Sequence, residues 1–324
     1  MTAGPPIAGA GPAPRRARAR RSHVPAVRAA VLAGLAAIAL ATPGFLSQPS
    51  ILSLLTTVSF IGCVAVGMTL ITISGNIMSF ALGALTGATA MIFILAVNWG
   101  GFVFGLVAAV VFAGAANAAQ GFLIGWLRAN PIIVSIAALA LIYGVAEAFA
   151  EHGTIYAAAG TSFGGFKGKL AGVPVEFVVL LAVTALAQFI LSFTAFGRHL
   201  FLIGASLRAA EAVGIRTWRA IAGAYLWAGL FTAPAGIMLA IRYDAASMNY
   251  GIGYEYDAIA AVLVGGTVIK GGEGSALRTF AGALIIGIIQ VVLVLRGLRT
   301  EWQYLIAGVI VLGMIALQTQ GTRD

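Results

Sequence analysis

The chain has 324 residues, of which 60% are hydrophobic and 9% are charged, and its formal net charge is +9. Soluble domains contain roughly 45–50% apolar and about 25% charged residues, so this composition is typical of a membrane protein. No polar segment is long enough to fold as a separate soluble domain. The single cysteine, Cys63, excludes an intrachain disulfide and a cysteine-based metal cluster, and we expect it to be a buried packing residue.

The positive charge is concentrated in a Pro-, Ala- and Gly-rich N-terminus, directly before the first apolar run. The arginines there are Arg15, Arg16, Arg18, Arg20 and Arg21. This position favours a cytoplasmic flank near anionic lipid over nucleic-acid binding. The sequence predicts a cytoplasmic tail at 1–25, a transmembrane domain at 26–320 and a second tail at 321–324. A cleavable signal peptide within 1–46 is the alternative.

Apolar runs bounded by Gly, Pro or charge predict an all-α, polytopic fold of about ten transmembrane helices. The runs are 26–46, 51–73, 79–97, 101–127, 131–151, 174–196, 218–241, 258–269, 276–296 and 302–318. The eighth would rise only about 18 Å as a helix, whereas a hydrocarbon core is roughly 30 Å thick. We therefore expect at least one short or interrupted helix.

The distribution of Lys and Arg predicts the orientation. If the N-terminus is cytoplasmic and the runs alternate, 14 of the 19 Lys and Arg residues lie inside. Cytoplasmic loops carry an excess of these residues, so we expect both termini in the cytoplasm. Gly and Ala at four-residue spacing, as in "GALTGATAM" at 83–91, further predict close helix packing.

Catalytic motifs are missing from the sequence. It contains no GxxxxGK[ST] phosphate loop, no GxSxG and no HExxH, so we expect no enzyme activity and no nucleotide hydrolysis by this chain. Ion-coupled transport requires ionisable residues at membrane depth. Glu147 is the only acidic candidate well inside a run, and it lies near the outer end of run 131–151. The sequence therefore gives little support for proton- or sodium-coupled transport.

The loop at 197–217 contains "SLRAAEAVG", which predicts a short amphipathic helix with Ser206 as N-cap and Gly214 as the stop. Two spans need no such helix merely to be connected. It either binds a soluble partner or lies on the membrane surface, and the residues alone do not decide between these.

The stretch "GYEYDAIAAVLVGGTVIKGGEGS" at 253–275 contains the short run. Asp257 is predicted to cap this helix at its positive dipole end, while Glu255 and Asp257 are alternatively a docking point for a soluble protein. We expect hinges at the glycines that allow the chain to turn at membrane depth. These are Gly265, Gly266, Gly271 and Gly272.

Three stretches together resemble the permease subunit of bacterial ABC importers of the ribose/xylose type. They are "FGRHLFLIGASLRAAEAVGI" at 196–215, the stretch at 253–275, and "TFAGALIIGIIQVVL" at 279–293. "NPIIVSIAALALIYG" at 130–144 is similar more loosely, and the resemblance covers roughly 60–320. It implies a bacterial cytoplasmic membrane protein that forms the path for a monosaccharide or related polyol.

The resemblance also implies partners. A second permease chain, identical or different, completes the pore, a separate ABC ATPase binds ATP and Mg, and a periplasmic or tethered solute-binding protein delivers the cargo. The loop at 197–217 becomes the coupling helix that inserts into the ATPase. Its contact residues are Leu207, Arg208, Ala210, Glu211, Gly214 and Ile215.

The chain departs from the family at "GNIMSFALG", 75–83, which has one extra residue and lacks the usual Asp. The cargo therefore differs or the copy has diverged. A nucleoside or a branched-chain amino acid remains an alternative cargo, and a stand-alone carrier remains an alternative to an ATP-driven importer.

Amide and hydroxyl groups suit a neutral sugar. Asn76, Ser79, Asn117 and Gln120 are candidates for the substrate pathway, with interhelical hydrogen bonding as the alternative. The layout shared by 75–87 and 253–266 also predicts an inverted repeat with interrupted helices.

Overall fold

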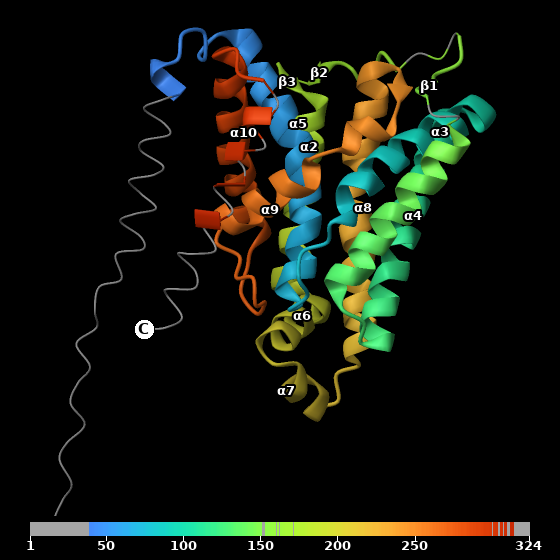
Figure 1. The fold of residues 1–324 in the computed structure, drawn as a ribbon, viewed down its shortest axis with the longest axis vertical. Helices are drawn as coiled ribbons and strands as arrows, with labels where there is room; N and C mark the ends of the chain where they lie inside the picture. The colour runs from blue at the N-terminus through green and yellow to red at the C-terminus, as the bar shows by residue number, and fades with distance from the viewer. Residues whose placement is uncertain are drawn as a thin grey trace, which may run out of the picture.

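The structure is a computed structural model that describes residues 39–150, 153–159, 161, 163–170 and 172–299, with short pieces between 301 and 313. It is a bundle of α-helices with very little strand (Figure 1). In this view α2 (Gln48–Ile73) and α8 (Thr217–Tyr243) lie at the centre. One flank is formed by α3 (Ala81–Leu127) and α4 (Pro131–Phe149), and the other by α9 (Tyr254–Val264) and α10 (Ala276–Leu295).

Six described helices are long and apolar enough to cross a membrane: α2, α3, α4, α5 (Val175–Phe193), α8 and α10. The chain is therefore a multi-pass membrane protein. The predicted number of about ten helices is not reproduced within the described residues. Runs 79–97 and 101–127 form one element, α9 is too short to span, and most of runs 26–46 and 302–318 lies outside the described residues.

The merged element α3 bends back on itself. Gly101 has φ 82° and ψ 178°, which breaks the 47-residue helix near the predicted boundary. A β-carbon at Gly105 would lie 3.0 Å from the Phe93 carbonyl and would overlap the Val97 side chain. The two halves of α3 therefore pack against each other next to the turn, because glycine allows both the positive φ and the close approach.

Short elements lie at the two ends of the bundle (Figure 1). At one end are α6 (Ala195–Ala205) and α7 (Leu207–Ala212). The opposite end carries two antiparallel pairs, in which Ile155 faces Ala246 and Lys169 faces Pro174. These pairs join β1 (Ile155–Tyr156) to β4 (Ala245–Ala246), and β2 (Lys169–Leu170) to β3 (Val173–Pro174); one 3₁₀ turn, η1 (Met248–Gly251), follows β4.

Helix boundaries follow local chemistry. The Ser47 side chain accepts a hydrogen bond from the Ser50 N–H at the start of α2, and the Asn130 side chain accepts one from Ile132 before α4. Both helices have Pro in their first turn, where a missing N–H costs nothing. At the end of α10, Gly297 takes φ 73° and its N–H donates to the Val294 carbonyl. Such glycine caps satisfy carbonyls that the helix leaves free.

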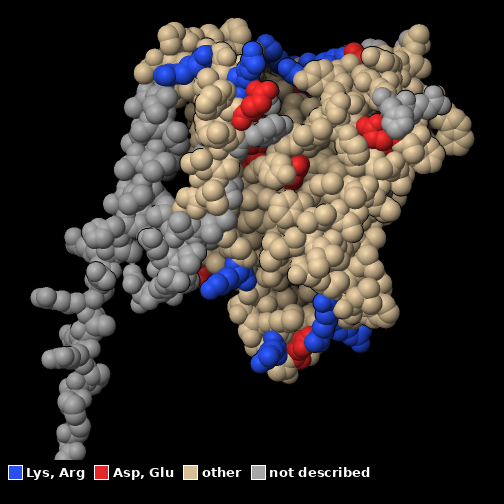
Figure 2. All heavy atoms as spheres, viewed as in Figure 1, with Lys and Arg blue, Asp and Glu red and all other residues tan. Residues whose placement is uncertain are grey.

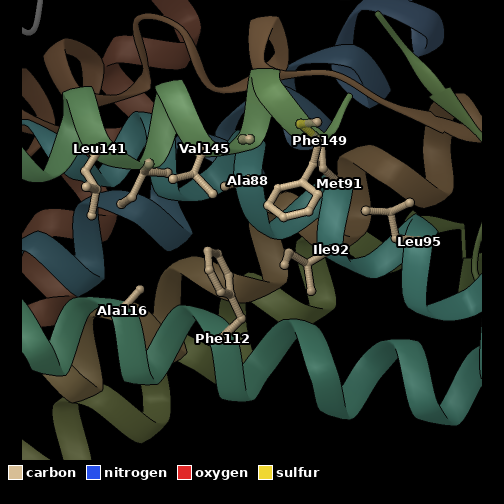
Figure 3. Close-up of a pocket in the computed structure, with 11 residues that line it drawn as sticks. Ala88, Met91, Ile92, Leu95, Phe112, Ala116, Leu141, Val145 and Phe149 are labelled. Atoms are coloured by element: carbon tan, nitrogen blue, oxygen red, sulfur yellow. The ribbon is translucent and has the colours of Figure 1, made fainter. Parts of the chain in front are cut away.

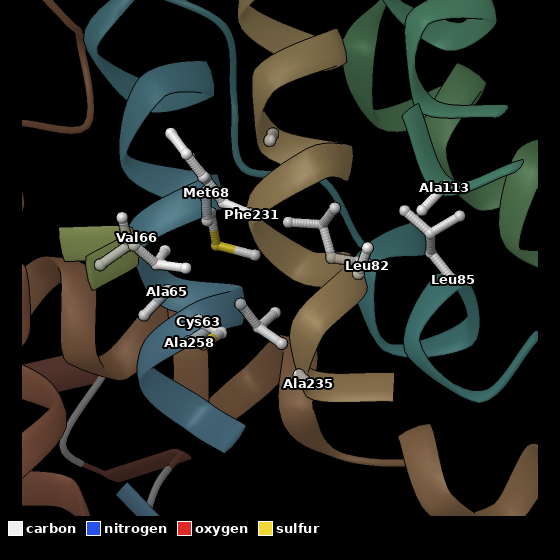
Figure 4. Close-up of a cluster of buried hydrophobic side chains, with 14 of the residues drawn as sticks. Cys63, Ala65, Val66, Met68, Leu82, Leu85, Ala113, Phe231, Ala235 and Ala258 are labelled. Carbon is white, nitrogen blue, oxygen red and sulfur yellow. The ribbon is translucent and has the colours of Figure 1, made fainter. Parts of the chain in front are cut away.

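The core lies where α2, α3, α8 and α9 meet (Figure 4). Cys63 and Met68 of α2, Leu82 of α3, Phe231 of α8 and Ala258 of α9 are all buried there. The expectation that Cys63 is a packing residue is confirmed, since its thiol is free and fully buried. α2 is buried over most of its length, so this helix faces protein rather than lipid.

Small residues bring the helices into backbone contact, as the sequence predicts. A β-carbon at Gly229 of α8 would overlap the Ala113 carbonyl of α3. One at Gly121 of α3 would lie 2.9 Å from the Ala222 Cα, and one at Gly282 of α10 would overlap the Ala261 carbonyl of α9. In lipid, such close approach supplies the van der Waals contact that holds helices together.

Charged side chains gather at the two ends of the molecule and leave a broad band between them nearly uncharged (Figure 2). That distribution suits a bilayer, because a charge in the hydrocarbon region is costly. One end pairs Lys167 with Asp244, and Arg242 with Glu176 at 3.4 Å.

We predict that Gly229→Ala destabilises the protein by about 1–3 kcal/mol, the usual cost of overpacking. The added methyl would overlap the Ala113 carbonyl, which is backbone and cannot rotate away. Thermal unfolding in detergent measures the effect. Gly144→Ala in α4 is the matched control, because a β-carbon there meets no atom within 4 Å. Equal melting temperatures for the two variants would contradict the packing described.

Candidate functional site

The predicted helix in the loop at 197–217 is present and is stopped at both ends. The Ser206 side chain accepts a hydrogen bond from the Ala209 N–H, so its prediction as N-cap is confirmed. Gly214 has φ 83°; its N–H donates to the Glu211 carbonyl at 3.0 Å, and that of Ile215 to the Ala210 carbonyl at 3.1 Å. This hydrogen-bond pair is the Schellman motif that ends helices at glycine. The six-residue α7 is therefore a defined unit.

Two contacts hold α7 against the bundle. Arg128, directly after α3, donates to the Glu211 carboxylate at 3.0 Å, and the Thr217 hydroxyl at the start of α8 donates to the same oxygen at 3.3 Å. Ala210 is buried, whereas Leu207, Arg208 and Val213 are exposed. The helix and its C-cap thus expose Leu207, Arg208 and Val213 where α7 projects from the end of the bundle (Figure 1).

The short helix is also present, as α9, with 11 residues. The prediction that Asp257 caps it is wrong, because the helix begins four residues earlier than expected. Gly253 is the N-cap with φ 91°, and no side chain bonds there. Glu255 and Asp257 instead lie within the first turn, where the helix dipole still favours negative charge.

Both carboxylates are buried, Glu255 to 7% and Asp257 to 6% exposure, which argues against docking of a soluble protein at them. Asp257 accepts a hydrogen bond of 2.7 Å from the Gln290 side chain of α10. Glu255 points at the first turn of α3, since a β-carbon at Gly83 would overlap its carboxylate. Two acidic groups at membrane depth are thus enclosed by the interrupted helix and its neighbours.

The four glycines predicted as hinges have different local roles. Gly266, with φ 81°, ends α9 in a Schellman motif in which the Thr267 N–H donates to the Val262 carbonyl. Gly265 packs on α10, because a β-carbon there would lie 2.6 Å from the Arg278 carbonyl. Gly271 and Gly272 have φ 85° and 78° and form the tip of the loop between α9 and α10. Only these last two lie at a turn between helices.

The four candidate pathway residues are all buried, and they lie in two places. Asn76 and Ser79 belong to the non-helical segment 74–80 between α2 and α3, where the Asn76 amide donates to the Ser74 hydroxyl. Asn117 donates to the Tyr225 carbonyl of α8 at 2.7 Å, the interhelical hydrogen bond of the alternative interpretation. Both polar atoms of the Gln120 side chain are buried without a hydrogen-bond partner among the described residues.

A cavity of about 400 Å³ lies between the two halves of α3 and α4 (Figure 3). Its walls include Met91, Ile92, Phe112, Leu141 and Phe149, and every lining residue is Ala, Met, Ile, Leu, Phe or Val. Such walls offer no hydrogen-bonding side chain to a sugar hydroxyl. The cavity is therefore unsuited to hold a polar solute.

Sequence reasoning missed several residues that shape these regions: Arg128, Gln290, Tyr225 and Gly204. Arg128 lies two residues before the Asn130–Pro131 helix start, and this position was a signal for a residue at a helix terminus. Gln290 is the only amide in the apolar run 276–296, so a polar partner within the membrane was foreseeable. No local sequence pattern indicates that Gly204 contacts the end of α2 and the loop after α9.

The permease family described as the permease component of a branched-chain amino acid transport system matches residues 50–315. The chain belongs to this permease family. Among curated relatives, the ribose import permease of Bacillus subtilis is 30% identical, covering 86% of this chain and 88% of that protein. An inner membrane ABC transporter permease of Escherichia coli K12 is 31% identical over 85% of both chains.

The autoinducer 2 import system permease of Yersinia pseudotuberculosis is 31% identical and covers 78% of this permease and 72% of that protein. No solved structure matches this permease significantly. These relatives are transport subunits rather than enzymes, so this chain is a membrane transport subunit.

We predict that Gln290→Met destabilises the permease by about 1–3 kcal/mol, because it leaves the buried Asp257 carboxylate without its donor. Methionine keeps the size of the side chain, so the lost hydrogen bond is the main change. Thermal unfolding in detergent measures the loss. Asp257→Asn retains an acceptor and is expected to lose less; an unchanged melting temperature for Gln290→Met would show that the bond contributes nothing.

Proposed function

We propose that this chain is the membrane-spanning subunit of an ATP-driven importer and forms the path for a monosaccharide or related polyol. The observation that carries the proposal is α7, a capped helix that projects from one end of a permease. A six-residue helix with exposed Leu207 and Val213 suits insertion into a soluble partner, because apolar side chains anchor interfaces.

The ribose and autoinducer 2 import permeases among the relatives support a sugar-like cargo. A branched-chain amino acid is the second candidate, favoured by the description of the family, and a nucleoside is an alternative suggested by the altered motif at 75–83. Asn76, Ser79, Asn117 and Gln120 are neutral donors and acceptors, which suits an uncharged solute better than an ionic one.

The proposal assigns ATP and Mg to a separate ATPase, since this sequence has no phosphate-binding loop. A solute-binding protein delivers the cargo on the opposite face, and a second permease chain completes the pore. The proposed contact to the ATPase comprises Leu207, Arg208, Glu211, Gly214 and Ile215, whereas Ala210 is buried and packs beneath them. We propose no cofactor bound to this chain itself.

The α6–α7 end is proposed to be cytoplasmic, in a bacterial inner membrane. It carries basic residues including Arg128, Arg198, Arg208, Arg216 and Arg219, as the positive-inside rule requires. Runs 26–46 and 302–318 lie mostly outside the described residues. If both also span the membrane, this orientation leaves both termini in the cytoplasm, and the number of helical segments returns to about ten.

We also infer an inverted repeat. Segment 74–80 enters the bundle from the α6–α7 end, where Gly75 contacts Gly204, and leads into α3. Segment 244–253 enters from the opposite end, where Ala157 donates to the Asp244 carbonyl, and leads into α9. The two helix starts meet inside, because a β-carbon at Gly251 would overlap the Gly83 carbonyl. Opposed, interrupted segments are typical of transporters built from such repeats.

Substitutions in α7 test the coupling. Glu211→Ala removes an exposed ion pair that contributes only about 0–1 kcal/mol to stability, and Gly214→Arg places a bulky side chain at φ 83°. We expect both to reduce ribose uptake severalfold in vesicles that also contain the ATPase and binding protein, while membrane abundance stays unchanged for Glu211→Ala.

Gly144→Ala is the control, since Gly144 lies within α4, away from α7, and a β-carbon there meets no atom within 4 Å. Normal uptake by both α7 variants would favour a stand-alone carrier. Concentrative ribose uptake by the purified chain alone, without any ATPase, would overturn the proposed function.

Gln120→Met tests the pathway. Methionine preserves the volume but removes the buried amide, so uptake of radiolabelled ribose is expected to fall without a decrease in membrane abundance. If uptake is unchanged, Gln120 is a packing residue and leaves the pathway.

A further inference from the structure

Three segments that are distant in sequence meet near the α6–α7 end with no side chain between them. They are the C-terminus of α2, the last turn of α6 and the tip of the loop at 265–275, which descends toward α6 in Figure 1. Each contributes glycine to the contact. We call this the glycine junction, and it comprises Gly75, Gly204, Gly271 and Gly272.

The contacts in the glycine junction join backbone to backbone. The Gly272 N–H donates at 3.0 Å to the carbonyl of Ile73, the last residue of α2, whose carbonyl has no partner within the helix. A β-carbon at Gly204 would overlap both that carbonyl oxygen and the Gly272 nitrogen. One at Gly271 would overlap the backbone of Gly75. Backbone atoms have no rotamers, so this contact has little freedom to absorb a displacement.

The glycine junction is joined to α7 through a very short length of chain. Gly204 lies in the last turn of α6, and only Ala205 separates it from Ser206, the N-cap of α7. The Ser206 N–H donates to the Leu202 carbonyl, which ties the start of α7 to α6. A displacement of α7 therefore reaches Gly204 directly.

On its other sides the glycine junction meets both interrupted parts of the bundle. Gly75 is the second residue of the non-helical segment 74–80, which leads to α3. Gly272 lies in a turn closed by the bond from the Val268 N–H to the Glu273 carbonyl, and this turn follows α9. The junction thus touches both segments at which the regular helices of the bundle are interrupted.

We propose that Gly204 is a positioning residue for transport, which transmits displacement of α7 to segments 74–80 and 265–275. The inference rests on the proposed contact of α7 with an ATPase. A glycine that only filled space would affect stability alone. A transmitting glycine also sets how much solute is moved for each ATP hydrolysed, so the two roles are separable by measurement.

The test is Gly204→Ala in the complete complex of permease, ATPase and binding protein in vesicles. Gly204 lies in a helix and does not have positive φ, so alanine introduces only the steric overlap. We expect ATP hydrolysis to persist while ribose transported per ATP falls by about fivefold or more, the lower end of coupling between distant sites. Gly144→Ala, in open space on α4, is the control and is expected to behave as wild type.

A second measurement applies if Gly204→Ala does not accumulate. Ala205→Cys and Lys270→Cys, both at exposed positions, are combined in a Cys63→Ala background and bridged with a reducible thiol reagent. Because the junction has little freedom to absorb a displacement, α6 and the loop at 265–275 move together, so we expect the bridged protein to retain ATP-dependent ribose uptake with normal ribose per ATP.

The outcomes separate the two proposals. Wild-type uptake that needs no ATPase would overturn the proposed function together with this inference. ATP-dependent wild-type uptake, with normal ribose per ATP in Gly204→Ala or with uptake lost on bridging and regained on reduction, would overturn the role of the glycine junction alone.

Discussion

At Gly204, Gly229 and Gly282, an added β-carbon would overlap the backbone of a neighbouring segment, and this close backbone approach is the constraint on which the rest of the bundle depends. Helices in lipid gain no hydrophobic free energy by pairing, so they must gain van der Waals contact instead. Glycine and alanine permit that contact. Some buried hydroxyls are satisfied within their own helices: Thr69 and Thr86 donate to carbonyls four residues earlier.

Such packing also explains how the bundle holds irregular backbone and acidic groups inside a membrane. Segment 74–80 and the loop at 265–275 are not helical, and such backbone is tolerated at depth only against protein or water. Here Gly272 satisfies the end of α2, and α10 supplies Gln290 to Asp257. The interrupted helices are therefore stabilised by neighbours that approach closely enough to reach them.

The same arrangement gives the permease a projecting helix, α7, at one end and interrupted helices at its centre. Helix α7 is short, capped and projecting, which suits a surface that another protein grips. The start of α9 faces the first turn of α3 inside the bundle, so the two interruptions are in contact. The glycine junction lies between α7 and both interrupted segments. Under the proposed coupling to a separate ATPase, this continuity would carry a displacement of α7 to the interrupted segments.

The sequence by itself determined much of this protein. Apolar runs predicted most described helices within a few residues, because the bilayer demands long uncharged segments. Ser206 and Gly214 fixed both ends of α7, because capping depends on neighbours in the chain. The tertiary structure decided what depends on distant partners. Asp257 bonds to Gln290 rather than capping α9, Asn117 reaches the backbone of α8, and Gly204 meets Ile73, because hydrogen bonds and steric contacts between remote segments exist only after the helices pack.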